Sequence, residues 1–142
     1  MIELLFFASE FQCGANAELL NIQVGVYHNQ ELVQTMSKGD TALLEVDSVK
    51  DLTFTYTPVG NATCSFADPS EKVLAPNDAL PPMAGVYEQQ SIQAMQGDLK
   101  EYEELLLVEL GTTNNTSAAY DLQDVVIKVN NNPPTLAQLF AD

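Results

Sequence analysis

Alternation of apolar and polar side chains at every second residue is the feature that most restricts what this chain can fold into. In the segment 52–57, Leu52, Phe54 and Tyr56 share one face and three threonines share the other, until Pro58 ends the pattern. Successive side chains of a β-strand point to opposite faces of a sheet, whereas a helix repeats every 3.6 residues. The segment therefore predicts a strand with one buried face.

The same alternation recurs along the chain in segments of strand length. It occurs at Ile22, Val24 and Val26, at Ala42, Leu44 and Val46, and at Val125, Ile127 and Val129, and the apolar start Met1–Ala8 also fits a strand. Short turns at 27–30, 37–40 and 47–50 separate the early runs, which is typical of antiparallel hairpins. We predict four strands in a meander from residue 18 to residue 57, with no helix between them.

A region rich in proline, asparagine and serine follows, from residue 58 to residue 82. This composition predicts a long loop or arm, with at most a helical turn over 68–75. Strand signals resume over 85–95, where Val86, Ile92 and Ala94 share one face.

The segment 98–110 fits two structures. Asp98 and Glu101 fit a helix capping box, and Gly111 fits a helix stop. In contrast, Leu105–Val108 is a continuous apolar run, as in a central strand that is buried on both faces. We predict a strand over 103–110 because the flanking segments are strand-like, and helix remains the alternative.

These patterns predict one all-β domain in a chain of 142 residues, an ordinary length for a single domain. About seven to nine strands with regularly spaced turns indicate an antiparallel β-sandwich, either Ig-like or jelly-roll-like, or a short barrel. We place the sandwich domain at 1–130. Residues 131–142 form an Asn/Pro linker and tail, with one amphipathic helical turn expected at 135–140.

The charge of the chain is strongly negative. Twenty Asp and Glu residues stand against five lysines and no arginine, which gives a net charge of -15. Nucleic-acid binding uses clustered Lys and Arg, whereas these lysines are scattered, and an anionic membrane would repel the chain. The N-terminal apolar run is too short for a signal peptide or a membrane helix. We therefore expect protein partners, and neither nucleic acid nor membrane.

The residues that usually carry catalysis are sparse in this sequence. His28 is the only histidine and lies in a predicted turn, which suits a solvent-facing residue better than a general base. Cys13 and Cys64 fit either one disulfide or two buried thiols, and with one histidine they are too few for a structural zinc site. No phosphate-binding loop or hydrolase motif is present. We predict that the protein is not an enzyme and needs no cofactor, calcium excepted.

Calcium is the metal that best suits this composition, because it takes carboxylate and carbonyl oxygens as ligands. The candidate ligands are Asp121 and Asp124, with Glu103 and Glu104 beside them if the two segments pair. The phrase at 121–126 resembles the strand entry of some bacterial extracellular calcium-binding sandwiches, and this resemblance implies a stabilising calcium site. The alternative is that the two aspartates are ordinary turn and strand-edge residues.

Two roles fit these observations. The first is a non-enzymatic structural protein of an assembly, in particular a virion component such as a capsid decoration (cement) or tail-associated subunit that forms homo-oligomers. The second is a secreted or cell-surface binding module of the adhesin or carbohydrate-binding type, in which calcium would stabilise the fold. Large apolar residues in loops and tails often contact partners, so the expected interface residues are Phe66, Tyr87, Leu139 and Phe140. Their alternative place is the subunit's own core.

Overall fold

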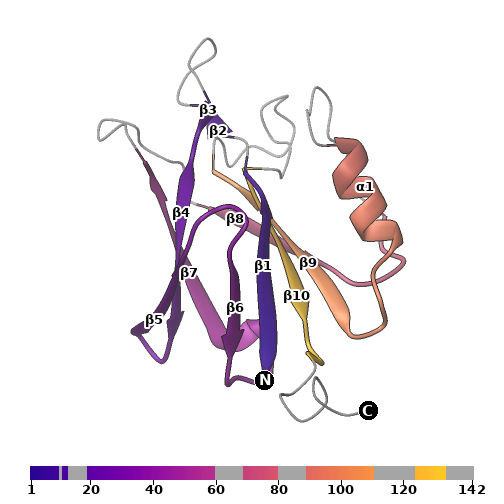
Figure 1. The fold of residues 1–142 in the computed structure, drawn as a ribbon, viewed down its shortest axis with the longest axis horizontal. Helices are drawn as coiled ribbons and strands as arrows, with labels where there is room; N and C mark the ends of the chain where they lie inside the picture. The colour runs from indigo at the N-terminus through magenta and orange to yellow at the C-terminus, as the bar shows by residue number, and fades with distance from the viewer. Residues whose placement is uncertain (10, 13–18, 60–68, 80–88, 111–123, 134–142) are drawn as a thin grey trace.

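A computed structural model describes residues 1–9, 11–12, 19–59, 69–79, 89–110 and 124–133 of the chain. In this part of the chain two β-sheets face each other, and a helix lies outside the larger sheet (Figure 1). The elements are, in chain order, β1 (Ile2–Ala8), β2 (Phe11–Gln12), β3 (Leu19–Leu20), β4 (Ile22–His28), β5 (Glu31–Met36), β6 (Thr41–Leu44), a 3-10 helix (Val49–Asp51), β7 (Leu52–Pro58), β8 (Ser70–Leu74), α1 (Gln89–Gly97), β9 (Glu103–Glu109) and β10 (Val125–Asn130).

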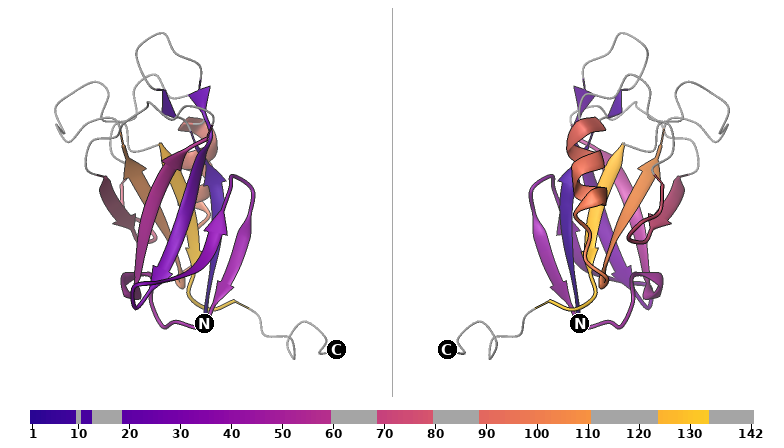
Figure 2. Two further views of the ribbon diagram at one scale, coloured as in Figure 1. Left: turned by 90° about the vertical axis from the view of Figure 1, so that its left-hand side faces the viewer. Right: turned by 90° about the vertical axis from the view of Figure 1, so that its right-hand side faces the viewer.

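The larger sheet has five antiparallel strands in the order β6-β1-β10-β9-β8, and the smaller has three in the order β5-β4-β7. Strands β2 and β3 form a separate short pair. The two sheets stack as layers, with α1 on the outer side of the larger one (Figure 2). This arrangement confirms the predicted all-β sandwich. The helical turn predicted at 135–140 lies outside the described residues.

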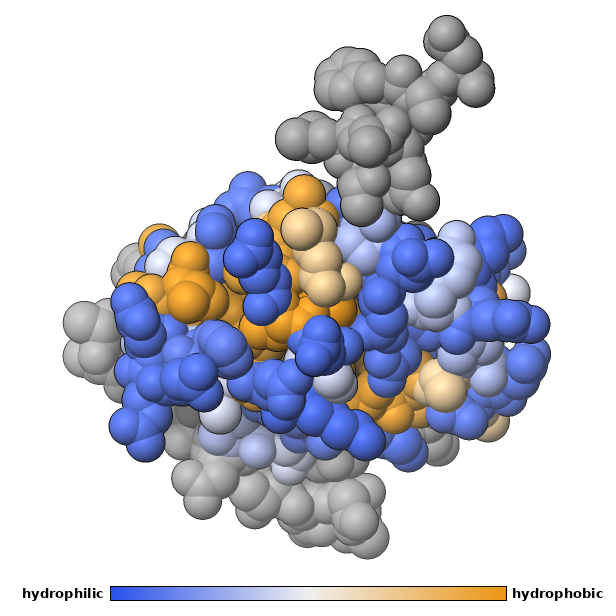
Figure 3. Space-filling model, turned by 90° about the horizontal axis from the view of Figure 1, so that it is seen from below, coloured by the Kyte–Doolittle hydropathy of each residue, from blue (hydrophilic) through white to orange (hydrophobic). Residues whose placement is uncertain are grey.

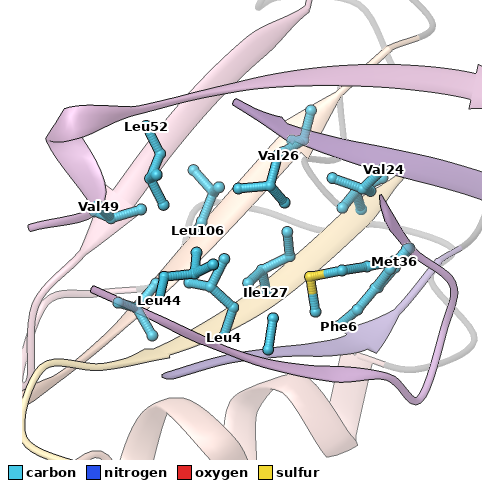
Figure 4. Close-up of a cluster of buried hydrophobic side chains, with 14 of the residues drawn as sticks. Leu4, Phe6, Val24, Val26, Met36, Leu44, Val49, Leu52, Leu106 and Ile127 are labelled. Carbon is cyan, nitrogen blue, oxygen red and sulfur yellow. The ribbon is translucent and has the colours of Figure 1, made fainter. Parts of the chain in front are cut away.

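The main core lies between the two sheets and is built from alternate residues of the facing strands. Leu4, Phe6 and Ile127 of the larger sheet and Val24 and Val26 of the smaller are completely buried there (Figure 4). Burying an aliphatic or aromatic side chain of this size contributes about 1.5–3 kcal/mol to folding. The alternation in the sequence therefore corresponds to the main hydrophobic core, as predicted.

A second, smaller core lies on the other face of the larger sheet, beneath α1. Ile92 of the helix is completely buried against this face, and Met95 and Leu99 are partly buried. The strand predicted over 85–95 is therefore wrong where the structure describes it, from residue 89 onward. Ile92, Met95 and Leu99 follow a helical spacing of three and four residues, whereas Ala94, which fits the strand pattern, is exposed.

The helix also explains the continuous apolar run in β9. Leu105 and Leu107 pack beneath α1, while Leu106 and Val108 point into the main core, so all four are buried. A strand covered on both faces has no exposed side to alternate with the buried one. The strand predicted over 103–110 is confirmed, since β9 spans Glu103–Glu109.

One strand lies inside the region predicted to be a loop at 58–82. Strand β8 pairs antiparallel with β9, so that Val73 lies opposite Leu106 and Leu74 opposite Leu105. The prediction of a loop is therefore wrong at 70–74, and so is the helical turn at 68–75. Serine, glutamate and lysine give β8 weak strand propensity, and pairing with the buried β9 overrides it.

The predicted four-strand meander is only half right. Strands β4 and β5 form the expected hairpin, but β6 crosses to the larger sheet and pairs with β1, and β7 returns beside β4. The turn before β6 is held to β1 by two backbone hydrogen bonds, from the Phe6 amide to the Asp40 carbonyl (3.0 Å) and from the Gly39 amide to the Phe6 carbonyl (2.8 Å). Gly39 has a φ of 95°, which glycine adopts without strain.

Candidate interaction surface

The predicted calcium ligands do not come together in the structure. In the antiparallel pair of β9 and β10, Glu103 lies opposite Asn130 at one end and Val108 lies opposite Val125 at the other. Asp124 directly precedes Val125 and is therefore level with Glu109, about 20 Å along the strands from Glu103 at roughly 3.3 Å per residue. Asp121 lies outside the described residues. Within the described ranges, no three His, Cys, Asp or Glu side chains gather closely enough to hold a metal ion.

The two glutamates instead make contacts within the fold. The Glu103 carboxylate accepts a hydrogen bond from the Lys100 amide (2.7 Å) and lies 2.9 Å from the Lys128 ammonium. Burial alone would raise the pKa of Glu103, but the Lys100 amide and the Lys128 ammonium outweigh it and hold the pKa below its usual range. Glu104 accepts a hydrogen bond from the Asn131 amide group (2.7 Å).

Asp124 also has a role in the fold. One of its carboxylate oxygens accepts a hydrogen bond from the Leu110 amide (2.7 Å), and its carbonyl accepts one from the Ser9 hydroxyl (3.0 Å). The Asp124 carboxylate thus satisfies a backbone N–H group just beyond the end of β9.

Several other residues singled out by the sequence lie outside the described part of the chain. These are the predicted interface residues Phe66, Tyr87, Leu139 and Phe140, and the two cysteines Cys13 and Cys64. His28 is described and ends β4, opposite Glu31 across the β4–β5 hairpin. The turn itself is Asn29 and Gln30, so His28 lies next to the predicted turn as the half-buried last residue of β4 and is not a solvent-facing turn residue.

Strand β5 is the most exposed strand of the sandwich among those whose side chains the structure describes. It is an edge strand, and its first five side chains, on both faces, are exposed; only Met36 is buried. Leu32 and Val33 are 51% and 43% exposed. An open depression of about 420 Å³ lies along the strand and is lined by Leu32, Val33, Gln34 and Thr35. The strand thus presents apolar side chains and a free backbone edge together.

The other three edges of the two sheets are less open. At the edge of the smaller sheet, the hydroxyl of Tyr56 in β7 donates a hydrogen bond to the Glu71 carboxylate of β8 (2.9 Å), which ties β7 to the larger sheet. Strand β8 itself carries Glu71 and Lys72, charges of the kind that discourage edge pairing. Strand β6 has only four residues. Of the four described edge strands, β5 therefore has the fewest features that discourage pairing with another chain.

The outer face of the three-stranded sheet has no charged side chain. Cross-strand pairing places Gly25 between Thr35 and Thr55, and Tyr27 between Leu32 and Thr53. The residues that point outward are Gln23, Gly25 and Tyr27 of β4, Leu32 and Thr35 of β5, and Thr53, Thr55 and Thr57 of β7. The chain carries 25 charged side chains, five Lys plus 20 Asp and Glu, and none of them points outward from the described strands of this sheet. We call this face, together with the edge of β5 from Leu32 to Thr35, the uncharged surface; Glu31, at the start of β5, lies at its margin.

Leu32 leans onto this face. A methyl group placed on Gly25 would overlap the Thr55 hydroxyl, and it would lie 3.6 Å from a Leu32 methyl carbon and 3.2 Å from the Tyr27 ring. The absence of a side chain at Gly25 thus lets Leu32, Tyr27 and Thr55 lie close together. The end of the sandwich at which β5 begins also exposes apolar atoms in a broken band between polar side chains (Figure 3).

The alternation in the sequence does not distinguish β5 from the other predicted strands. The signal that could have found it is the adjacent pair Leu32 and Val33, between two turns, in a segment without proline or lysine. Two adjacent apolar residues in a strand point to opposite faces, so one of them must lie outside a single core.

Comparison of the chain with protein-family models, with curated proteins and with solved structures found no match. Among the described residues, no helix has the length and apolar character needed to cross a lipid bilayer. The features of the molecule that bear on its role are therefore the uncharged surface and the composition of the chain.

Proposed function

We propose that this protein is a non-enzymatic structural subunit of an assembly, and that the assembly is a virus particle on which it serves as a capsid decoration or tail-associated protein. The observation that carries the proposal is the uncharged surface, in which an exposed edge strand adjoins a sheet face without charge. Surfaces that combine exposed apolar side chains with an unprotected strand edge are suited to protein partners.

The chemistry of the uncharged surface supports a binding role over a catalytic one. Its side chains are threonine hydroxyls, two amides, one tyrosine and aliphatic groups, and the nearest carboxylate of β5, Glu31, lies at its margin. General acid–base or nucleophilic catalysis requires groups that exchange a proton near neutral pH or attack as an anion. The acidic remainder of the chain fits an exterior position, where negative charge keeps subunits soluble.

The proposal is tested on virus particles from the source that encodes this sequence. The particles are purified on a density gradient and their proteins are quantified by mass spectrometry. We expect peptides of this chain to sediment with the major shell protein at a fixed ratio. Particles that lack the chain, from a source that expresses it, would contradict the proposal.

The binding-module alternative predicts a different result. A secreted or surface module would bind a glycan or cell-surface ligand as a free subunit. Selective binding on a glycan array, abolished by Thr55→Lys in the uncharged face, would support that role in place of the assembly role.

A further inference from the structure

We propose that the C-terminal segment 134–142 packs on the outer face of strands β1 and β6 of its own chain, beside α1, as a strap that covers this face. Three features carry this assignment. They are an apolar face that α1 leaves uncovered, the place where the described chain ends, and the sequence of the segment. The docking of the strap does not depend on the assembly role.

Helix α1 covers only part of the outer face of the five-stranded sheet. The described residues that pack beneath it belong to β8, β9, β10 and the end of β1, and none belongs to β6 (Figure 2). Leu5 of β1 and Leu43 of β6 point to this outer side, because their neighbours Leu4 and Leu44 point into the main core. Leu43 is 58% exposed, the largest exposed fraction among the large hydrophobic side chains that the structure describes. We call the outer surface around Leu5 and Leu43 the β1–β6 face.

The described chain ends close to the β1–β6 face. Strand pairing places Asn130, Glu3 and Leu43 in one row across β10, β1 and β6. Neighbouring strands are about 4.8 Å apart, so Leu43 lies roughly 10 Å from the end of β10. Leu5 lies two residues beyond Glu3 along β1, which is about 7 Å further.

The segment starts from a fixed point and is long enough to reach this face. The Asn131 amide donates a hydrogen bond to the Tyr102 carbonyl (2.8 Å), and Pro133 is buried, so the chain is held to its last described residue. Residues 131–133 turn toward the ends of β1 and β6 (Figure 2). At about 3.3 Å per extended residue, four residues span the distance to Leu43. A segment tethered this close meets the face at a high effective concentration.

Other segments that lie outside the described residues are joined to the fold elsewhere. Residues 10, 13–18 and 111–123 join the larger sheet at its opposite end, where β1 and β9 end and β10 begins. Residues 60–68 and 80–88 adjoin the segment that contains β8, at the opposite edge of the sheet from β6. The uncharged surface is also a poor site for the strap, because it lies on the far side of the sandwich from the β1–β6 face.

The sequence of the segment suits an apolar face. Thr135 and Gln138 fit a helix capping box, and Leu136, Leu139 and Phe140 then share one side of the predicted helical turn. Helix α1 covers the remainder of the sheet with apolar residues at the same spacing of three and four. Residues 134–141 carry no charged side chain, so they pack on an acidic molecule without adding charge repulsion. The strap therefore uses Leu139 and Phe140 in the packing of their own subunit.

The test measures hydrogen exchange of the backbone amides in the segment by NMR on the full chain. Leu43→Glu places a charge on the β1–β6 face. Leu32→Glu is the matched control, because Leu32 is 51% exposed and lies on an edge strand of the other sheet. We expect the amides of residues 138–141 to exchange at least about tenfold more slowly in the wild-type chain and in L32E than in L43E. Circular dichroism confirms that both variants are folded.

Two further measurements approach the contact from the side of the segment. Leu139→Glu should remove the same protection, and nuclear Overhauser effects should join the Phe140 ring to the Leu43 methyl groups of the wild-type chain. The protection should not change on about a hundredfold dilution, because a tethered segment does not depend on protein concentration.

Three results would overturn the docking of the strap. These are amides of the segment that exchange at the rate of an unstructured peptide in the wild-type chain, equal rates in L43E and L32E, or protection that disappears on dilution. The last result would place the segment on a second copy. The presence or absence of the chain on virus particles bears on the assembly role alone, so the two ideas can fail separately.

Discussion

At the scale of single residues, one of the few lysines of this acidic chain compensates a buried carboxylate. Lys128 in β10 lies 2.9 Å from Glu103 in β9, and the Glu103 side chain is only 8% exposed. A buried carboxylate without a partner would be costly. Glu103, which the sequence suggested as a calcium ligand, is therefore held by an ammonium group and a backbone amide of its own chain.

The first prediction concerns the pH dependence of Glu103. Its pKa is lowered below 4.5 in the folded state, so the folded chain binds fewer protons than the unfolded chain between the two values. The stabilisation is complete above pH 4.5 and is lost as the pH falls through the folded pKa. We expect Glu103→Gln to reduce the free energy of unfolding at pH 7 by about 1–2 kcal/mol, and by much less at about pH 3.

Urea unfolding at the two pH values measures this effect. Glu104→Gln is the matched control, because Glu104 accepts its hydrogen bond from the neutral amide of Asn131. We expect the control to cost less than half as much at pH 7. An equal loss for Glu103→Gln at both pH values would show that its charge does not stabilise the fold.

The second prediction concerns the β4–β5 hairpin turn. Asn29 and Gln30 have φ angles of 53° and 67°, and asparagine followed by glycine is the preferred pair for a two-residue turn of this kind. Gln30→Gly should raise the free energy of unfolding by about 0.5 kcal/mol, since the relief of left-handed strain exceeds the added chain entropy. Gln34→Gly in β5 is the control and should lower stability by about 0.5–1 kcal/mol, because glycine weakens a strand. Thermal melts that show the same sign for both variants would contradict the argument.

At the scale of elements, a side-chain hydrogen bond joins the two sheets on the side of β7 and β8. The hydroxyl of Tyr56 reaches from the smaller sheet to Glu71 of the larger one. Burial, together with the negative charge of Glu71, raises the pKa of Tyr56 far above its usual value of 10.0. The phenol must therefore stay neutral in the folded chain, and folding stability should fall as the pH rises above 10.

The third prediction tests this tie between the sheets. Tyr56→Phe should lower the free energy of unfolding by about 1 kcal/mol at neutral pH, because the exposed Glu71 regains water when it loses its donor. The free energy of unfolding of the variant should also fall less steeply above pH 10 than that of the wild-type chain. Tyr102→Phe, at an exposed tyrosine, is the control and should change neither quantity. An unchanged alkaline profile in Tyr56→Phe would mean that another group causes the decline.

The elements also differ in how well they could be predicted. The alternation identified β1, β4, β6, β7 and β10, because a half-buried strand records its buried face in every second residue. The alternation gave a wrong prediction for α1. Ile92 fits a strand pattern as well as a helical one, as long as the sheet face against which it packs is unknown. The alternation also missed β8, where the evidence for a strand lies in its partner β9 and in few of its own residues.

At the scale of the whole molecule, the net charge of -15 opposes both folding and self-association. The fourth prediction is that salt stabilises the chain. Raising NaCl from about 0.01 M to about 1 M shortens the Debye length from roughly 30 Å to roughly 3 Å. We expect a higher Tm by a few degrees, equivalent to about 1 kcal/mol.

Calorimetry and light scattering over the salt series check this expectation, with calcium chloride at matched ionic strength as a separate arm. A Tm that falls with salt would contradict dominant self-repulsion. A further rise with calcium would reveal a calcium site that includes carboxylates outside the described residues, such as Asp121. That result would support a calcium site, but with ligands other than the full set that the sequence predicted.

The candidate surface could be predicted only in part. The three outward threonines of β7 follow from the alternation, but the neighbours that complete the face do not, because they depend on which strands pair. The same limit applies to the calcium proposal. Glu103 lies in β9 and Asp124 directly precedes the paired strand β10, but the antiparallel register places them at opposite ends of the pair.

By itself the sequence determined that this chain is an acidic β-sandwich, because the side-chain period of a strand and the net charge are local or additive properties. The crossing of β6 to the other sheet, the helix over the larger sheet and the exposure of β5 were decided only in the tertiary structure. These features depend on which apolar face meets which across long separations in the chain. Several pairings satisfy the same local pattern, and the choice among them is made by the packing of the whole molecule.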